Sequence, residues 1–215
     1  MIVVFRRTGE KRYSVEAQRE GAPDVVRHSA PGYDRFVPHD MMHLVVESQL
    51  GLTRGVFGQL ASGGNAGSFI PLKQTGQETA RTRTRAKSRG TKLMRQGRDD
   101  LAQSERATYI CWIEWMARSQ SSERRKRAQV MALHEAQLKD DASAAVHRAL
   151  NQGKLDRICG HLDQLSAHWS KLEVGASLSV RWPDLAIVSE TGGNICATVT
   201  SNQALESNSA TIEIA

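Results

Sequence analysis

The chain has 215 residues, enough for one medium-sized domain with a normal hydrophobic core. Apolar residues make up 40% and aromatic residues 5%, which indicates a folded body diluted by polar segments. The three cysteines, Cys111, Cys159 and Cys196, are widely spaced without a CxxC pair, which argues against a disulfide framework or a cysteine-built zinc site and favours a reducing compartment. Because residues 1–5 are too short for a signal peptide and no stretch approaches the roughly 18 apolar residues of a membrane span, we expect a cytoplasmic protein without a membrane partner.

The N-terminal region predicts an antiparallel meander. Residues 2–7 and 12–18 are rich in β-branched and aromatic side chains and are joined by a turn at 8–11, which is typical of a β-hairpin. Residues 24–28 predict a third strand, and Pro31-Gly32 ends the sheet region.

A helix is predicted next, over His39–Leu50, with Pro38 at its start and Gly51 as its C-terminal cap. Its apolar residues recur at steps of three and four, which indicates one buried face. Residues 54–61 predict a short second helix. The glycine-rich loop at 62–67 lacks the lysine and hydroxyl of a phosphate-binding loop.

The first helix carries the motif HDxxH. One helical turn separates His39 from His43, so both imidazoles can reach one metal ion, zinc being the expected one, and Asp40 is the candidate catalytic base. Glu47 lies about 12 Å from His39 along the helix, too far to share that ion, but it can complete a site with His43 alone or hold an imidazole from behind. A third ligand must come from another element. The candidates are His28, Asp34, His134, His147, His161 and His168.

The same motif also has a purely structural interpretation. Pro-His-Asp is a good helix start, and His43 can pack at the edge of a core with a hydrogen-bond partner. The sequence leaves both interpretations open.

Basic residues are concentrated in the segment 71–99. Between Thr79 and Arg98 the chain has eight basic residues and no acid, which leaves the rest of the chain at about −2 out of a net +6. Few apolar residues are present, so we expect a mobile connector. It is either a solvated linker or an anion-binding segment with non-specific affinity for nucleic acid. The candidate anion-binding residues are Arg81, Arg83, Arg85, Lys87 and Arg89.

The second half of the chain predicts helices. Residues 100–118 and 124–150 have helical spacing, and the segment 155–172 alternates steps of three and four with leucine, isoleucine and tryptophan. The short loop 151–153 predicts an antiparallel hairpin of the last two helices, through which a protein partner or self-association is possible. Three tryptophans are expected in the core: Trp112, Trp115 and Trp169.

The predicted fold class is therefore α+β: a small N-terminal antiparallel meander packed with helices, a C-terminal helical hairpin and a returning strand at Ser177–Trp182. We expect one domain over 1–182, composed of the meander and first helix (1–70), the connector (71–99) and the hairpin with its strand (100–182). Residues 183–215 predict a poorly ordered polar tail, in which 195–200 and 211–214 could be edge strands.

Two resemblances bear on the motif. The stretch PHDxxHxVVE, Pro38–Glu47, followed by GVFGQLASGG, Gly55–Gly64, resembles a type of uncharacterised bacterial protein. The HDxxH element is also similar to the zinc motif of a ubiquinone-biosynthesis family, and that resemblance implies that His39, Asp40 and His43 are metal-associated. The family has a further glutamate about eleven residues beyond the second histidine, where this chain has Thr53–Val56.

Two classes of function follow from these patterns. The main expectation is a small binding or regulatory module that acts on a protein or an anionic partner, because the basic segment and the hairpin are present and no catalytic set is complete. The alternative is a metal-dependent, hydrolase-like enzyme with an HDxxH zinc site.

Overall fold

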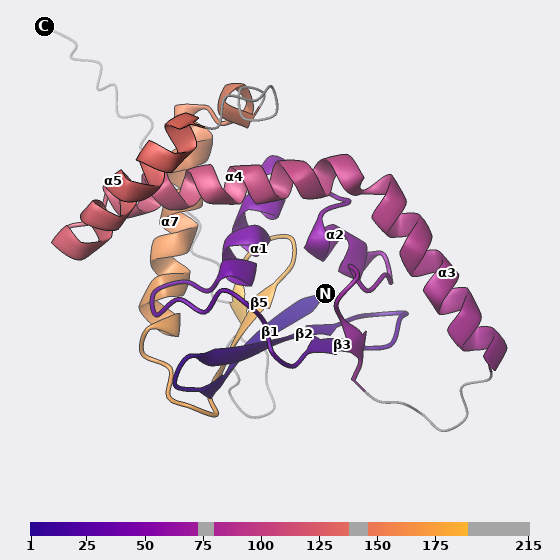
Figure 1. Cartoon of the computed structure of the whole chain (residues 1–215). Coiled ribbons are helices and arrows are strands. Elements are labelled where there is room, and N and C mark those ends of the chain that lie inside the picture. The colour runs from indigo at the N-terminus through magenta and orange to yellow at the C-terminus, as the bar shows by residue number, and fades with distance from the viewer. Residues whose placement is uncertain (73–79, 138–145, 189–215) are drawn as a thin grey trace, which may run out of the picture.

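The structure, a computed structural model, describes residues 1–72, 80–137 and 146–188. Its strands form one antiparallel sheet, in the order β4-β3-β2-β1-β5-β6, with the helices lying over one face (Figure 1). The strands are β1 (Ile2–Gly9), β2 (Arg12–Gln18), β3 (Val25–Arg27), β4 (Ile70–Pro71), β5 (Ser177–Arg181) and β6 (Ile187–Val188).

The predicted meander and the returning strand are both confirmed. Antiparallel pairing places Phe5 of β1 opposite Val15 of β2, and on its other edge β1 pairs with β5, with Val3 opposite Val180. These residues are buried because alternate positions of each strand face the helices. The two ends of the described chain therefore meet in the centre of the sheet.

Helix α1 (His39–Leu50) has the predicted bounds and ends at Gly51 in the left-handed conformation, with φ of 67°. It differs from the prediction in having more than one buried face, since every residue from Asp40 to Glu47 is buried. The reason is its position beneath α4 and above the sheet, with α7 and α2 also in contact (Figure 1). A helix in this position must satisfy its polar side chains internally.

The remaining helices close the core over α1. They are α2 (Val56–Ala61), α3 (Ala80–Gln96), α4 (Arg98–Ala117), α5 (Ser122–Gln137) and α7 (Gln152–Trp169). The predicted seam of α7 is confirmed, because Ile158, Leu162, Leu165 and Trp169 are all buried. Trp115 is buried as expected, and Trp112 is only partly so.

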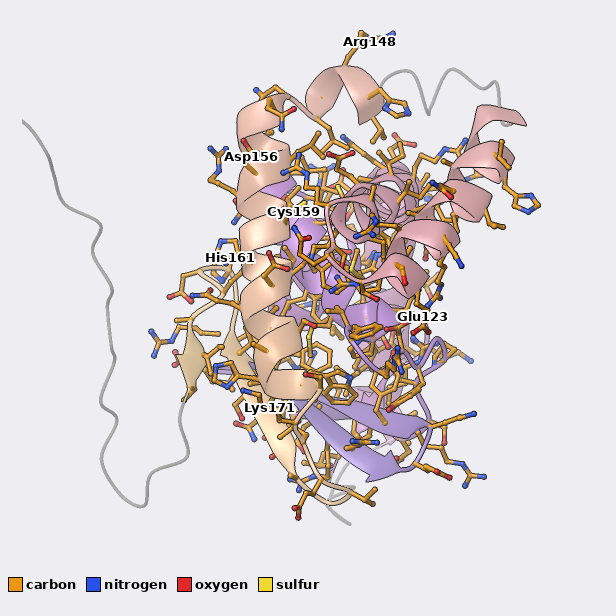
Figure 2. The ribbon with its side chains drawn as sticks, turned by 90° about the vertical axis from the view of Figure 1, so that its left-hand side faces the viewer. Glu123, Arg148, Asp156, Cys159, His161 and Lys171 are labelled. Atoms are coloured by element: carbon orange, nitrogen blue, oxygen red, sulfur yellow. The ribbon has the colours of Figure 1, made fainter. Side chains whose placement is uncertain are left out.

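The partners of these helices differ from the predicted hairpin. The seam of α7 packs against α1 and α4, and α5 folds back along α4, where the Tyr109 hydroxyl donates to the Met131 carbonyl at 3.3 Å. Figure 2 shows α7 as an upright helix, with Asp156, Cys159 and His161 along its length. Periodicity identified the buried face of α7, but it could not choose between the helices available to cover it. Residues 138–145, where the predicted 124–150 helix continues, lie outside the described residues.

The connector is also different from its prediction, since residues 80–96 form helix α3. Arginine, lysine and alanine are good helix formers, and the end of the helix is anchored. Arg89 donates to the Ser62 carbonyl at 2.7 Å, and Leu93 and Met94 pack beside Gly64 and Gly67 of the glycine-rich loop. Leu93 and Met94, two of the few apolar residues of the segment, therefore attach the C-terminal end of α3 to the glycine-rich loop.

The last part of the chain is described only as far as residue 188. Within the predicted polar tail, β6 adds a short edge strand to β5. The predicted strands at 195–200 and 211–214, and Cys196, lie outside the described residues. Among the helices that the structure describes, none is long and apolar enough to cross a membrane.

Trp169 is the largest buried side chain that joins the helices to the sheet. Its indole packs edge-on against Tyr13, with 5.9 Å between ring centroids, and its Nε1 donates to the Asp34 carbonyl at 3.0 Å. We predict that Trp169→Ala lowers the free energy of unfolding by about 3–5 kcal/mol, measured by urea denaturation. Lys171→Ala, two residues further at an exposed position, should change it by less than about 0.5 kcal/mol.

Candidate metal centre

The structure brings His39 and His43 together with Glu105, a residue of α4. The two imidazole rings are 4.5 Å apart between centroids. The Glu105 carboxylate lies 3.4 Å from Nε2 of His43 and 3.9 Å from Nε2 of His39. The potential ligand atoms all lie within 4.8 Å of one another, so the three side chains could hold one metal ion.

The position of His39 depends on a close approach by the loop before α1. Gly32 has φ of 71°, and a Cβ at this residue would lie 2.6 Å from Cβ of His39. The Gly32 carbonyl accepts the backbone N–H of His39 at 3.0 Å. A residue with a side chain would be strained and would also push His39 away from its partners.

His43 is held from behind by a relay of hydrogen bonds. Its Nδ1 lies 2.7 Å from the Ser104 hydroxyl, which donates to Oε1 of Glu47 at 2.8 Å. Because the hydroxyl has one hydrogen and gives it to Glu47, Nδ1 of His43 must be the donor to Ser104. Nε2 is then directed at the Glu105 carboxylate. Nε2 is therefore the nitrogen that is left to bind a metal ion.

Glu47 links the relay to α2. Its buried carboxylate accepts the backbone N–H of Val56 at 2.8 Å and that of Phe57 at 2.9 Å. A Cβ on Gly55 would lie 2.3 Å from Cδ of Glu47, so only glycine allows α2 to approach this closely. Burial raises the pKa of Glu47, and His43 and the three hydrogen bonds counteract this rise. Glu47 therefore lies one hydroxyl away from the imidazole and supports it from behind.

Asp40 is bonded to side chains of the sheet and not to His39, His43 or Glu105. Its buried carboxylate accepts the Tyr13 hydroxyl at 2.8 Å and faces a guanidinium nitrogen of Arg27 at 3.3 Å. Burial is the main cause that raises the pKa of Tyr13, and the charge of Asp40 raises it further. The candidate base is thus joined to the sheet, between β2 and β3.

The protonation states of the exposed ligands suit a metal ion. Burial lowers the pKa of His39, and the neighbouring His43 lowers it further, which favours the neutral imidazole. A hydrogen bond from His43 is the main cause that lowers the pKa of Glu105, which favours the carboxylate. A neutral imidazole and an ionised carboxylate are the forms that bind divalent metals.

The third ligand is a residue that the sequence did not suggest. Among the described residues, the cluster with metal-ligand geometry contains none of the six candidates from the sequence. Asp34 instead accepts a hydrogen bond from Arg127, and its other oxygen accepts the backbone N–H of Phe36. Glu105 is one of several acids in its helix, and nothing in its local pattern distinguishes it before the packing of α4 on α1 is known.

The candidate anion-binding residues belong to α3, another part of the fold. Lys87 and Arg89 are exposed, and Arg89 is bonded to the Ser62 carbonyl. For Arg81, Arg83 and Arg85 the structure gives the helical backbone. The two buried thiols, Cys111 and Cys159, are unpaired, and burial raises the pKa of Cys111 to about 12 and that of Cys159 to about 11, as expected for unreactive side chains.

In comparisons with known proteins, no family model, curated protein or solved structure matches this chain.

The contact between Gly55 and Glu47 gives a test of the relay. We predict that Gly55→Ala lowers the free energy of unfolding by about 1–3 kcal/mol, because the new methyl group displaces a buried carboxylate or the start of α2. The measurement is urea denaturation. Gly160→Ala is the matched control, since a Cβ there meets nothing within 4 Å, and alanine in helix α7 should stabilise by up to about 1 kcal/mol. Equal effects at both glycines would contradict the proposed packing.

Proposed function

We propose that the chain is a metalloprotein with a zinc ion at His39, His43 and Glu105, and that this ion serves a hydrolase-like activity. The observation that carries the proposal is the orientation of His43: its Nδ1 is occupied by Ser104, and its Nε2 faces an acidic side chain from another helix. Orienting hydrogen bonds of this type are typical of metal-binding histidines.

The donor set favours zinc. Two imidazole nitrogens and one carboxylate oxygen are ligands that zinc accepts, and three protein ligands leave a fourth position for water or substrate. Exposure supports access to that position, because the side chain of Glu105 is 65% exposed and that of His39 is 31% exposed, whereas His43 is at 3%. The cluster is thus anchored on its buried side and open on the other.

A zinc ion at such a site supplies an acidified water and polarises a carbonyl or phosphoryl group. The residues of this chain would orient the ligands and the substrate. Glu47 and Ser104 hold the imidazole of His43, and Glu105 supplies the negative charge. Asp40 could act as the base only by leaving Tyr13 and Arg27, so we propose that it positions these two side chains.

The first test is the zinc content of purified protein after exposure to stoichiometric zinc and gel filtration. We predict about one zinc per chain, and its loss in His39→Ala, His43→Ala and Glu105→Gln, measured by atomic emission. His161→Ala is the control, since His161 lies on α7 outside the cluster and should leave the zinc content unchanged. Full occupancy in the double variant of His39 and His43 would overturn the proposal.

A second test addresses the support behind His43. We predict that Ser104→Ala weakens zinc binding by 10- to 100-fold, because the imidazole loses the acceptor that directs Nε2 toward Glu105. Competition with a chromophoric chelator measures the affinity. Ser179→Ala removes a buried hydroxyl from β5 and should leave the affinity unchanged. Equal affinity in Ser104→Ala and in the unmodified chain would show that the relay has no role in metal binding.

The binding-module alternative is supported by one observation, the exposed basic face of α3. Lys87, Lys92 and Arg95 line a shallow groove along this helix, which extends away from the sheet and α1 (Figure 1). With few acids nearby in sequence, this face suits a phosphate backbone.

The test of this second function is affinity for a random-sequence duplex DNA at low and at physiological salt. We predict that affinity falls steeply with salt and that Lys92→Glu weakens it by at least threefold at low salt. Lys171→Glu is the control, because it makes the same change of charge at an exposed lysine just beyond the end of α7. Absence of binding at low salt would remove nucleic acid and leave a protein partner for this face.

A further inference from the structure

Arg27 lies beside the first turn of α1, at the end of β3. Its Nη1 is 3.3 Å from Oδ1 of Asp40, the residue next to His39. This is a long contact, and Asp40 has its better hydrogen bond with Tyr13, at 2.8 Å. A guanidinium has five N–H donors, and within the described residues the contact with Asp40 is the one hydrogen bond that the side chain of Arg27 makes. Most of its donors therefore remain available.

Arg27 is joined through Asp40 to the turn of α1 that carries His39. Its side chain is 26% exposed and that of His39 is 31% exposed, so solvent can reach both. An anion from solvent can therefore approach the guanidinium and this turn of α1.

A divalent ion at the cluster would make this part of the molecule more attractive to an anion. It would add two positive charges to the one of Arg27 and offset the negative charge of Asp40 and Glu105. A guanidinium next to a metal ion with an open position provides two attachment points for an anion, since arginine binds carboxylate and phosphate oxygens in a forked geometry.

We propose that Arg27 and the ion held by His39, His43 and Glu105 together bind a substrate that carries an oxyanion group, a carboxylate or a phosphate. The inference rests on the proposed zinc site and names the class of substrate for it. Asp40 has the role of orienting Arg27: it fixes one nitrogen of the guanidinium and leaves the others for the substrate.

A simpler role for Arg27 would be to neutralise the buried Asp40. The two roles differ in what they predict for anion binding. Neutralisation alone would make Arg27 matter for stability, with no effect on the affinity for anions. The substrate role requires that the affinity for an oxyanion depends on Arg27 when zinc is bound.

The experiment uses zinc-loaded protein freed of excess zinc, with the zinc content of each variant measured first. Inorganic phosphate and acetate are the two probes, titrated by calorimetry, and the tighter of the two identifies the group that the site prefers. We expect at least a tenfold loss of affinity for that probe in Arg27→Gln, with zinc content unchanged. Arg118→Gln, which removes an arginine paired with carboxylates at the end of α4, should leave the affinity as it is.

Each outcome decides the proposal. Equal probe affinity in Arg27→Gln and the unmodified chain, at full zinc content, would overturn the oxyanion site and leave the zinc site intact, and so would a failure of both probes to bind. Absence of zinc from the unmodified chain would overturn both. Should Arg27→Gln not fold, Arg27→Lys decides: it keeps the charge but loses the fork, so reduced affinity supports the proposal and unchanged affinity overturns it.

Discussion

The buried carboxylate of Glu47 is the interaction on which the rest of the site depends. It accepts two backbone N–H groups at the start of α2 and the hydroxyl of Ser104 on α4, so three helices meet at one side chain of α1. A buried carboxylate without these donors would be very costly. The same hydrogen bonds that make its burial tolerable also fix the distance between α1 and α4, and with it the distance from His43 to Glu105.

Local sequence patterns predicted correctly those features that depend on residues close together in the chain. The bounds of α1, the first hairpin and the buried face of α7 follow from caps, turn residues and periodicity. The choice of partner is not local. The seam of α7 fits any helix with a complementary face, and α1 and α4 cover it. The composition of α3 was misleading because Leu93 and Met94, two apolar residues among many cations, are enough to anchor its end.

The candidate site likewise has one part that local sequence patterns predict and one part that depends on how the helices pack. His39 and His43 were predictable because one helix sets their spacing, whereas Glu105 is 62 residues beyond His43 and reaches it only through helix packing. The sequence did contain one unused signal. The two halves of the motif PHDxxHxVVE and GVFGQLASGG are in contact: Gly55 leaves room for the Glu47 carboxylate, and Val56 and Phe57 donate to it. The second half of the motif therefore supplies the space and the hydrogen-bond donors that the Glu47 carboxylate of the first half needs.

The strand order has a consequence for how the chain is made. β1 is a central strand, but one of its two neighbours, β5, is formed by residues 177–181. During synthesis, the edge of β1 that pairs with β5 stays unpaired until almost the whole described chain has left the ribosome, while His39, His43 and Glu105 emerge earlier. An unpaired strand edge presents backbone N–H and C=O groups that can pair with other chains, so we expect aggregation to compete with folding until β5 pairs with β1.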